Sequence, residues 1–153
     1  LRPACDATLH IVGGPRDDFP EDVAYVSTLE RHAAASGVAD QIVWHGPQAA
    51  PAVLEILSTC DVFVHTSLTH SADKTLTEAM ASGLFVVSSN EAYEADLPAL
   101  CFKEPDPVAY AASITDFFAL PQSEQDELRR SLRICVEEKH SLRRLVANIL
   151  ALY

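Results

Sequence analysis

Short apolar runs alternate with segments of helical periodicity along most of the chain. Strands are predicted at residues 8–12, 41–45, 61–65, 84–88 and 99–102, where brief apolar stretches precede glycine, proline or polar residues. Helices are predicted at residues 21–36, 51–60, 74–82, 107–120, 123–140 and 141–153. Strands that are apolar on both faces and separated by helices are typical of a parallel sheet covered on each side. The pattern therefore predicts the α/β class, with a doubly wound and mostly parallel sheet.

The two C-terminal helices carry clear local signals. Ser123 and Asp126 have the spacing of a capping box, which predicts that Ser123 caps the helix over 123–140. The last helix has an apolar stripe, formed by Leu142, Leu145, Val146, Ile149 and Leu150. A stripe of this kind usually packs into a core, so residues 121–153 are expected to pack on the α/β body.

Composition and charge narrow the function classes. A chain of 153 residues with 48% hydrophobic residues is expected to form one domain, and no apolar run approaches the roughly 20 residues of a membrane helix. Eleven Lys and Arg against 22 Asp and Glu give a formal charge of -11, which would repel a phosphate backbone. Nucleic-acid binding is therefore not expected.

The cysteines indicate the cellular compartment of the protein, and the first residue indicates whether the chain is part of a longer one. The four cysteines form no C-x-x-C pair, which favours free thiols in a reducing compartment and predicts a cytoplasmic location. The chain starts with Leu1, and no basic and apolar signal segment follows it. We therefore expect the chain to be a piece of a longer protein.

Loops at the carboxyl ends of the predicted strands are the expected place for a ligand. In open α/β sheets these loops, here 13–20, 46–50, 66–74 and 88–94, line one edge. The third loop brings Asp73, Lys74 and Thr75 to the start of a helix, whose N–H groups and partial positive charge suit a diphosphate. Glu78, one turn further along, can accept hydrogen bonds from a diol.

Several of these residues also have ordinary structural interpretations. Thr75 and Glu78 have the spacing of a capping box, in which Glu78 would bond back to the helix start. Gly13 and Gly14 fit either a simple turn or a close approach of the backbone to a ligand. Lys74 can contact phosphate or pair with a neighbouring side chain in solvent. Both interpretations remain open for each residue.

The sequence does not indicate a metal site or the active site of a hydrolase. His65 and His70 have no third ligand at a suitable spacing, so no metal site is expected. Ser67 and Ser71 lie outside any G-x-S-x-G sequence, so a hydrolase triad is not expected.

A family resemblance rests on the same region. Residues 61–67 (DVFVHTS), 77–83 (TEAMASG) and 84–87 (LFVV) resemble the donor-binding half of GT-B retaining glycosyltransferases of the family 4-like group. That family contains sucrose and glycogen synthases and bacterial mannosyltransferases. The likeness extends from residues 9–15 (LHIVGGP), through 37–46 (GVADQIVWHG), to the closing helix 145–153. It implies a Rossmann-like C-terminal half of a GT-B fold.

The resemblance implies roles for particular residues. The family's ribose-binding Glu corresponds to Glu78, and its backbone contacts to the diphosphate correspond to Thr75 and Leu76. The base usually lies against the loop that matches Gly46 and the three residues after it. Gly13 and Gly14 are included among the candidate donor-binding residues on the close-approach interpretation given above.

Four positions depart from the family pattern, and one of them, Phe85 in place of the usual Pro, is expected to be a packing change. His70 stands where the family has a Glu that touches the transferred sugar, which makes His70 the candidate catalytic residue. Asp73 and Lys74 stand where Gly and Leu are common, and we include both among the candidate donor-binding residues.

The resemblance also implies an activity and missing parts. The full enzyme would transfer a sugar from a nucleotide-sugar donor with retention of configuration, without a required cofactor or metal. Residues 1–153 would form its donor-binding domain, while the acceptor domain and a strand–helix unit carrying an Arg and a Lys would precede Leu1. The chain alone is therefore expected to be inactive. In the resembling fold the last helix of residues 121–153 crosses from this domain onto the other one, so here it is alternatively expected to be exposed and to favour self-association. Two alternatives are a non-catalytic Rossmann-like interaction module and a nucleotide-sugar epimerase.

Overall fold

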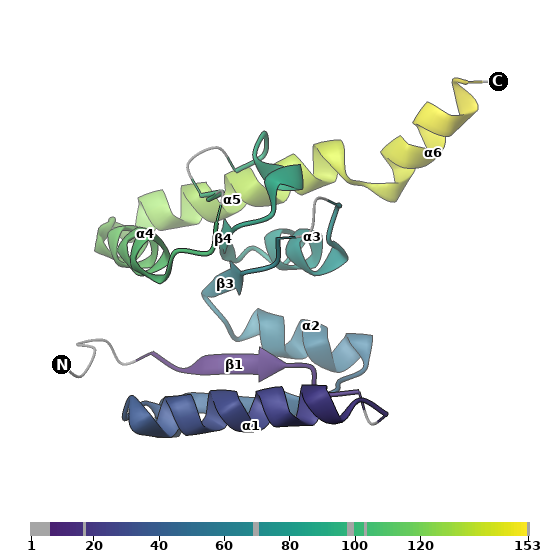
Figure 1. Cartoon of the computed structure of the whole chain (residues 1–153). Coiled ribbons are helices and arrows are strands. Elements are labelled where there is room, and N and C mark those ends of the chain that lie inside the picture. The colour runs from purple at the N-terminus through teal and green to yellow at the C-terminus, as the bar shows by residue number, and fades with distance from the viewer. Residues whose placement is uncertain (1–6, 17, 69–70, 98–99, 103, 153) are drawn as a thin grey trace. The chain divides into compact units, whose positions relative to one another are not determined.

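A computed structural model describes residues 7–16, 18–68, 71–97, 100–102 and 104–152 of the chain (Figure 1). The chain divides into two compact units, Leu1–Ile56 and Leu57–Tyr153, and each is described by itself. No helix among the described residues combines the length and the apolar character needed to cross a bilayer.

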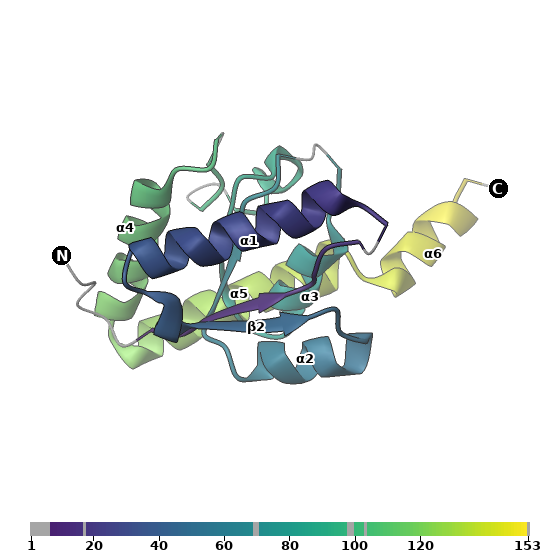
Figure 2. The same cartoon turned by 60° about the horizontal axis from the view of Figure 1, so that its bottom comes forward.

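The first unit contains a parallel pair of strands with helices on both sides. Its elements are β1 (Leu9–Val12), α1 (Pro20–Ala35), the 3-10 helix η1 (Ala39–Gln41), β2 (Ile42–Gly46) and most of α2 (Ala50–Ser58). Leu9 pairs with Ile42, and the register shifts near the end of the ladder, where Val12 lies opposite Gly46. In Figures 1 and 2 the strand pair lies between α1 and α2. This is the layer order of a doubly wound fold.

The second unit holds a second parallel pair of strands and the remaining helices. Its elements are β3 (Val62–His65), α3 (Lys74–Ala81), β4 (Phe85–Ser88), η2 (Glu91–Tyr93), α4 (Pro107–Ala119), α5 (Gln122–Lys139) and α6 (Leu142–Leu150). The ladder runs from Val62 opposite Phe85 to His65 opposite Ser88. An isolated parallel bridge joins Ser88 to Cys101. Parallel pairing throughout the described strands agrees with the predicted fold class.

Strand β4 forms the centre of the core of the second unit. All four of its residues are buried, as expected for a strand covered on both faces. Leu76 and Met80 of α3 are also fully buried. The Phe85 ring stacks on Phe117 of α4 with centroids 4.1 Å apart, which fixes α4 against the strand.

The predicted elements are found with small shifts at their ends, apart from two local details. The predicted strand 99–102 is reduced to the bridge at Cys101 within the described part of that segment. The capping box of Ser123 is wrong: Pro121 is the N-cap of α5, and no side chain caps that helix. Asp126 instead accepts a hydrogen bond from Gln122 Nε2 at 2.9 Å. Because α5 already begins at Gln122, Ser123 lies inside its first turn.

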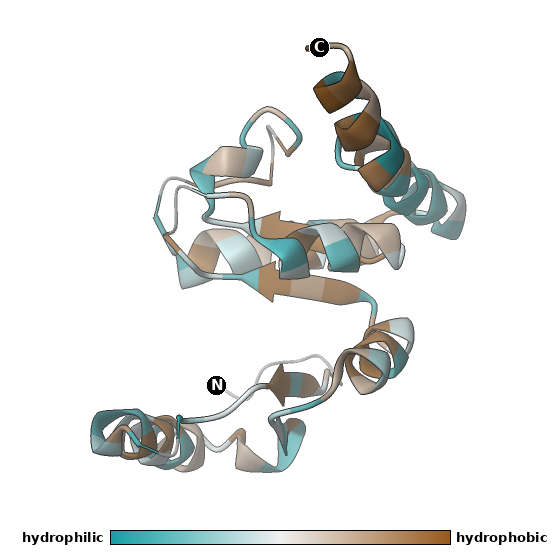
Figure 3. Cartoon of the chain, turned by 90° about the vertical axis from the view of Figure 1, so that its right-hand side faces the viewer, coloured by the Kyte–Doolittle hydropathy of each residue, from teal (hydrophilic) through white to brown (hydrophobic). Residues whose placement is uncertain are grey.

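Helix α6 does not bury its apolar stripe. Ser141 caps its start, and the stripe residues are between 46% and 74% exposed. Figure 3 shows hydrophobic residues along this last helix near the C-terminus. The expectation that the stripe packs into the core is therefore wrong for this chain.

Candidate functional site

The start of α3 is capped by Asp73. Its Oδ1 accepts hydrogen bonds from the Thr75 backbone N–H at 2.9 Å and from the Thr75 hydroxyl at 2.8 Å. Asp is among the best N-cap residues because its carboxylate satisfies an N–H group that has no partner within the helix. The helix therefore begins where the sequence predicts, but a different residue caps it.

Glu78 does not form the capping box with Thr75. Its Oε1 lies 3.1 Å from Nζ of Lys74, one turn earlier on the same helix. The Lys74 side chain is 83% exposed and the Glu78 side chain 30%. A pair of this kind at a helix surface contributes only a few tenths of a kcal/mol. The Glu78 carboxylate is therefore held weakly and can exchange Lys74 for another partner.

Leu76 lies between these polar residues and has a different role. The whole residue is 0% exposed, so it anchors α3 in the core. The contact of the Leu76 backbone with a diphosphate, which the family resemblance implies, stays a prediction.

A histidine at the end of β3 contacts the same carboxylate. His65 Nε2 lies 3.0 Å from Asp73 Oδ2, and His65 Nδ1 lies 3.2 Å from Ser88 Oγ. Ser88 also accepts a hydrogen bond from the Asn90 N–H. Each of these contacts is a hydrogen bond when the Ser88 hydroxyl donates to His65 Nδ1 and the proton on His65 Nε2 is donated to Asp73.

Ser88, His65 and Asp73 contact one another in the same succession as the serine, histidine and aspartate of a hydrolase triad, but their role is structural. Ser88 is 0% exposed and His65 7%. A nucleophile must reach its substrate, and the buried Ser88 hydroxyl cannot. The three residues instead tie β3 and β4 to the start of α3.

Side chains of the segment after β4 hold the loop between β3 and α3. Ser89 Oγ donates to the Ser67 carbonyl at 3.2 Å, and Asn90 Nδ2 donates to the Ser71 carbonyl at 2.9 Å. The Tyr93 hydroxyl donates to the Asp73 carbonyl at 2.8 Å. These donors are buried, so the described part of the loop is fixed by bonds that water does not replace.

The electrostatics of this site centre on Asp73. Burial raises the pKa of the Asp73 carboxyl, but hydrogen bonds from Thr75 and His65 outweigh burial and keep that pKa below its usual value. Burial, together with the charge of Asp73, raises the pKa of the Tyr93 hydroxyl. Asp73 is therefore a stable carboxylate at neutral pH.

Local structure explains why residues 13 and 14 of the first unit are glycines. The Gly13 N–H donates to the Gly46 carbonyl at 2.9 Å, and Gly13 has a φ of 120° that side chains rarely adopt. A Cβ on Gly14 would lie 3.0 Å from Cδ of Pro47. Backbone conformation accounts for Gly13 and close packing against Pro47 accounts for Gly14, and the contact of either glycine with a ligand stays a prediction.

The candidate catalytic residue His70 lies outside the described residues, so its role stays a prediction. Within the described part of the chain, no group of three or more His, Cys, Asp or Glu residues could hold a metal ion.

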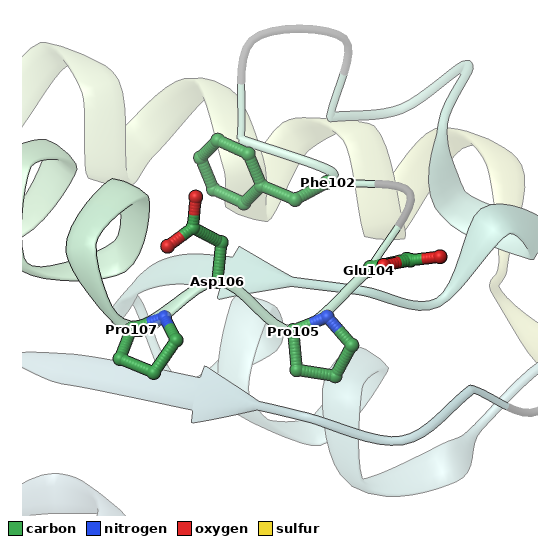
Figure 4. A pocket seen from close by; sticks show the side chains of 5 residues that line it. All are labelled: Phe102, Glu104, Pro105, Asp106 and Pro107. Carbon is green, nitrogen blue, oxygen red and sulfur yellow. The ribbon is translucent and has the colours of Figure 1, made fainter.

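A hollow of about 560 Å³ is lined by Phe102, Glu104, Pro105, Asp106 and Pro107 (Figure 4). The ionisable groups of its lining are both carboxylates. The carboxylate of Asp106 already caps α4, where it accepts from the N–H groups of Val108 and Ala109. The hollow therefore does not suit a diphosphate.

Sequence reasoning missed the contact between His65 and Asp73. The available signal was an Asp two residues before a Thr at a predicted helix start, which is an N-cap pattern. A histidine at the end of the preceding strand is then close enough to reach that cap.

Comparisons with known proteins agree with this architecture. A search of curated proteins finds no significant match. The crystal structure of Anabaena Alr3699/HepE in complex with UDP is similar, with a TM-score of 0.73 and 18% sequence identity. The match covers 96% of this chain and 41% of that one, so the chain spans less than half the length of that protein. This likeness shows the GT-B glycosyltransferase fold.

A family model identifies the chain more directly. The model described as "Glycosyl transferases group 1" matches residues 1–119. Those residues include the candidate site at the start of α3 and the glycines of the first unit. Since the match covers well over half of the sequence, the chain belongs to this glycosyltransferase family.

Proposed function

We propose that this chain is the nucleotide-sugar-binding half of a retaining glycosyltransferase. The observation that carries the proposal is the Glu78 carboxylate, one turn inside α3, whose ion-pair partner is the exposed Lys74. A carboxylate in this position can accept hydrogen bonds from both hydroxyls of a ribose, with charge-assisted bonds that are stronger than neutral ones.

The other candidate residues complete the donor site in this proposal. The backbone at Thr75 and Leu76 approaches the diphosphate, and the Lys74 ammonium can leave Glu78 to contact a phosphate oxygen. Contact of the base with the loop that begins at Gly46 stays a prediction of the family resemblance. His70, which stands in the sequence where the family has a Glu, stays the candidate for contact with the transferred sugar.

Catalysis would need more than this chain. As the diphosphate leaves, its developing charge is stabilised by cations and by the positive end of a helix, while the acceptor attacks from the same face of the sugar. The helix end is supplied by α3, and further cations and the acceptor domain would come from another part of the protein. No metal is required in this scheme. The UDP bound to the similar structure supports a uridine nucleotide as the first donor to test.

One observation favours a second function, a non-catalytic interaction module. The Asp73 carboxylate already occupies the Thr75 N–H at the helix start. A chain that had lost donor binding could keep a helix start whose N–H group is bonded by its own capping residue. Binding of a nucleotide separates the two functions.

Titration calorimetry with UDP and GDP tests the proposal. The Glu78→Gln variant keeps the shape of the side chain but removes its charge, so UDP affinity should fall by about tenfold or more. The matched control is Glu137→Gln, since Glu137 also pairs with a cation one turn earlier, Arg133, at 3.0 Å. The control should bind UDP as the parent chain does. Equal affinity of the parent and Glu78→Gln for UDP would contradict the ribose role, and the absence of binding to the parent would favour the interaction module.

A further inference from the structure

We infer that Asp73 is an internal anion at the start of α3 that competes with the diphosphate of the donor and weakens its binding. This inference rests on the proposed function, because it concerns the same site. It predicts that the parent chain binds a nucleoside diphosphate less tightly than a variant without the charge of Asp73.

The geometry shows why Asp73 cannot easily move aside. One carboxylate oxygen accepts two hydrogen bonds from Thr75, and the other lies 3.0 Å from His65 Nε2. The carbonyl of Asp73 also accepts a hydrogen bond from the Tyr93 hydroxyl. Moving the carboxylate away would break bonds on both of its oxygens. A ligand that enters this end of α3 therefore meets a fixed negative charge.

The partners of Asp73 are themselves held in place. His65 is 7% exposed and is bonded through Nδ1 to Ser88, which is 0% exposed. The Ser88 hydroxyl in turn accepts from the Asn90 N–H at 3.0 Å. The buried network fixes the imidazole, and the imidazole fixes the carboxylate.

The charged groups around the start of α3 do not favour the binding of an anion. Asp73 and Glu78 carry two negative charges, and Lys74 carries one positive charge that is already paired with Glu78. The helix end supplies about half a positive charge, which the capping carboxylate already neutralises. A diphosphate at Thr75 would share its N–H donor with a group of like charge. At the partial screening of a protein surface, a like charge about 5 Å away weakens binding on the order of tenfold.

Two substitutions remove the charge and keep a cap. In Asp73→Asn, the amide oxygen can accept from Thr75 and the amide N–H can donate to His65, which then carries its proton on Nδ1 toward Ser88. In Asp73→Ser, the hydroxyl oxygen caps the helix but does not reach His65. Agreement between the two variants separates the effect of charge from that of the histidine contact. Circular dichroism confirms that both remain folded.

Asp106→Asn is the matched control. Asp106 is also a capping carboxylate, bonded to the Val108 N–H at 2.9 Å, but it caps α4, which carries none of the candidate donor residues. The variant loses the same charge at another helix start. It should bind every ligand as the parent chain does.

The experiment measures the affinity of the full 153-residue chain and its variants for UDP, UMP and uridine by titration calorimetry. Both Asp73 variants should bind UDP about tenfold more tightly than the parent, with a smaller gain for UMP and none for uridine. Equal UDP affinity in the parent and both variants would overturn the inference and leave the proposed function standing. Weaker UDP binding by both variants would also overturn it, since Asp73 would then support the ligand. No UDP binding by the parent or by any variant would overturn both.

Discussion

The imidazole of His65 lies 3.0 Å from a carboxylate oxygen of Asp73, and this contact joins the last residue of β3 to the N-cap of α3. The two residues are eight positions apart in the chain. Through this contact the end of a buried strand fixes the start of the helix on which the candidate donor site is built. The same contact makes the stability of the fold depend on the ionisation of Asp73.

Acid should remove this contribution of Asp73. Because its folded-state pKa is lowered, the stabilisation is fully present above the pKa of an unfolded Asp, near about 3.9, and is lost as the pH falls through the lower folded value. Urea unfolding at a series of pH values should therefore show a steeper acid loss of stability for the parent than for Asp73→Asn. The remaining slope of the variant comes from other carboxylates, such as Asp96. Parallel pH profiles would contradict the contribution of Asp73.

The Tyr93 hydroxyl provides a second test of how the helix start is held. Tyr93→Phe removes the hydroxyl that donates to the Asp73 carbonyl, while the volume of the side chain stays almost unchanged. The free energy of unfolding should fall by about 1 kcal/mol, and amide exchange in the first turn of α3 should become faster. Tyr25→Phe is the control, because Tyr25 is 64% exposed on α1. Its substitution should change stability little, and an equal loss in both variants would argue against the hydrogen bond.

Much of this fold can be predicted from the sequence because its elements are encoded locally. The apolar run 84–88 predicts a strand buried on both faces, and β4 is buried at every position. The helix over 74–82 is found as α3 with its start at Lys74. Periodicity locates such elements without any knowledge of what they contact.

The remaining features depend on contacts between distant residues. Thr75 and Asp73 are both good capping residues, and the backbone conformation at Asp73, with φ of -99° and ψ of 123°, makes Asp73 the cap. The bond from His65 to Asp73 requires β3 and α3 to be correctly placed, which periodicity does not specify. For the same reason, the stripe on α6 predicts an amphipathic helix but not what covers it. The roles of Glu78 and His70 toward a donor stay predictions.

A buried carboxylate holds the end of α5 and can be tested separately. The Asp96 side chain is 8% exposed and bonds to Lys139 Nζ and, at 2.8 Å, to His140 Nε2. Burial raises the pKa of Asp96, but the bonds to Lys139 and His140 outweigh burial and lower it. Asp96→Asn should therefore reduce the free energy of unfolding at neutral pH by about 1–3 kcal/mol in urea titrations. Asp126→Asn, at an exposed position on α5, should reduce it by much less, and equal losses would contradict the role of Asp96.

The turn that ends α3 depends on Gly83. This residue has a φ of 81°, and a Cβ at this position would meet no atom within 4 Å. The cost of Gly83→Ala is therefore one of backbone conformation alone, about 1–2 kcal/mol in thermal or urea unfolding. Gly83→Asn should cost less, because Asn adopts this conformation more readily. Equal stability of the alanine variant and the parent would mean that the turn is not under this constraint.

The exposed stripe of α6 leads to a prediction about association. Leu145 and Ile149 are 55% and 47% exposed, so replacing both by Glu should change the free energy of unfolding by no more than about 0.5 kcal/mol. Leu132→Glu in α5 provides the contrast, because Leu132 is 7% exposed and its substitution should unfold much of the chain. In sedimentation velocity, the parent should self-associate with increasing concentration and the double variant should remain monomeric, since contiguous apolar surface favours association. A parent that stays monomeric at every concentration would exclude α6 as a surface for self-association.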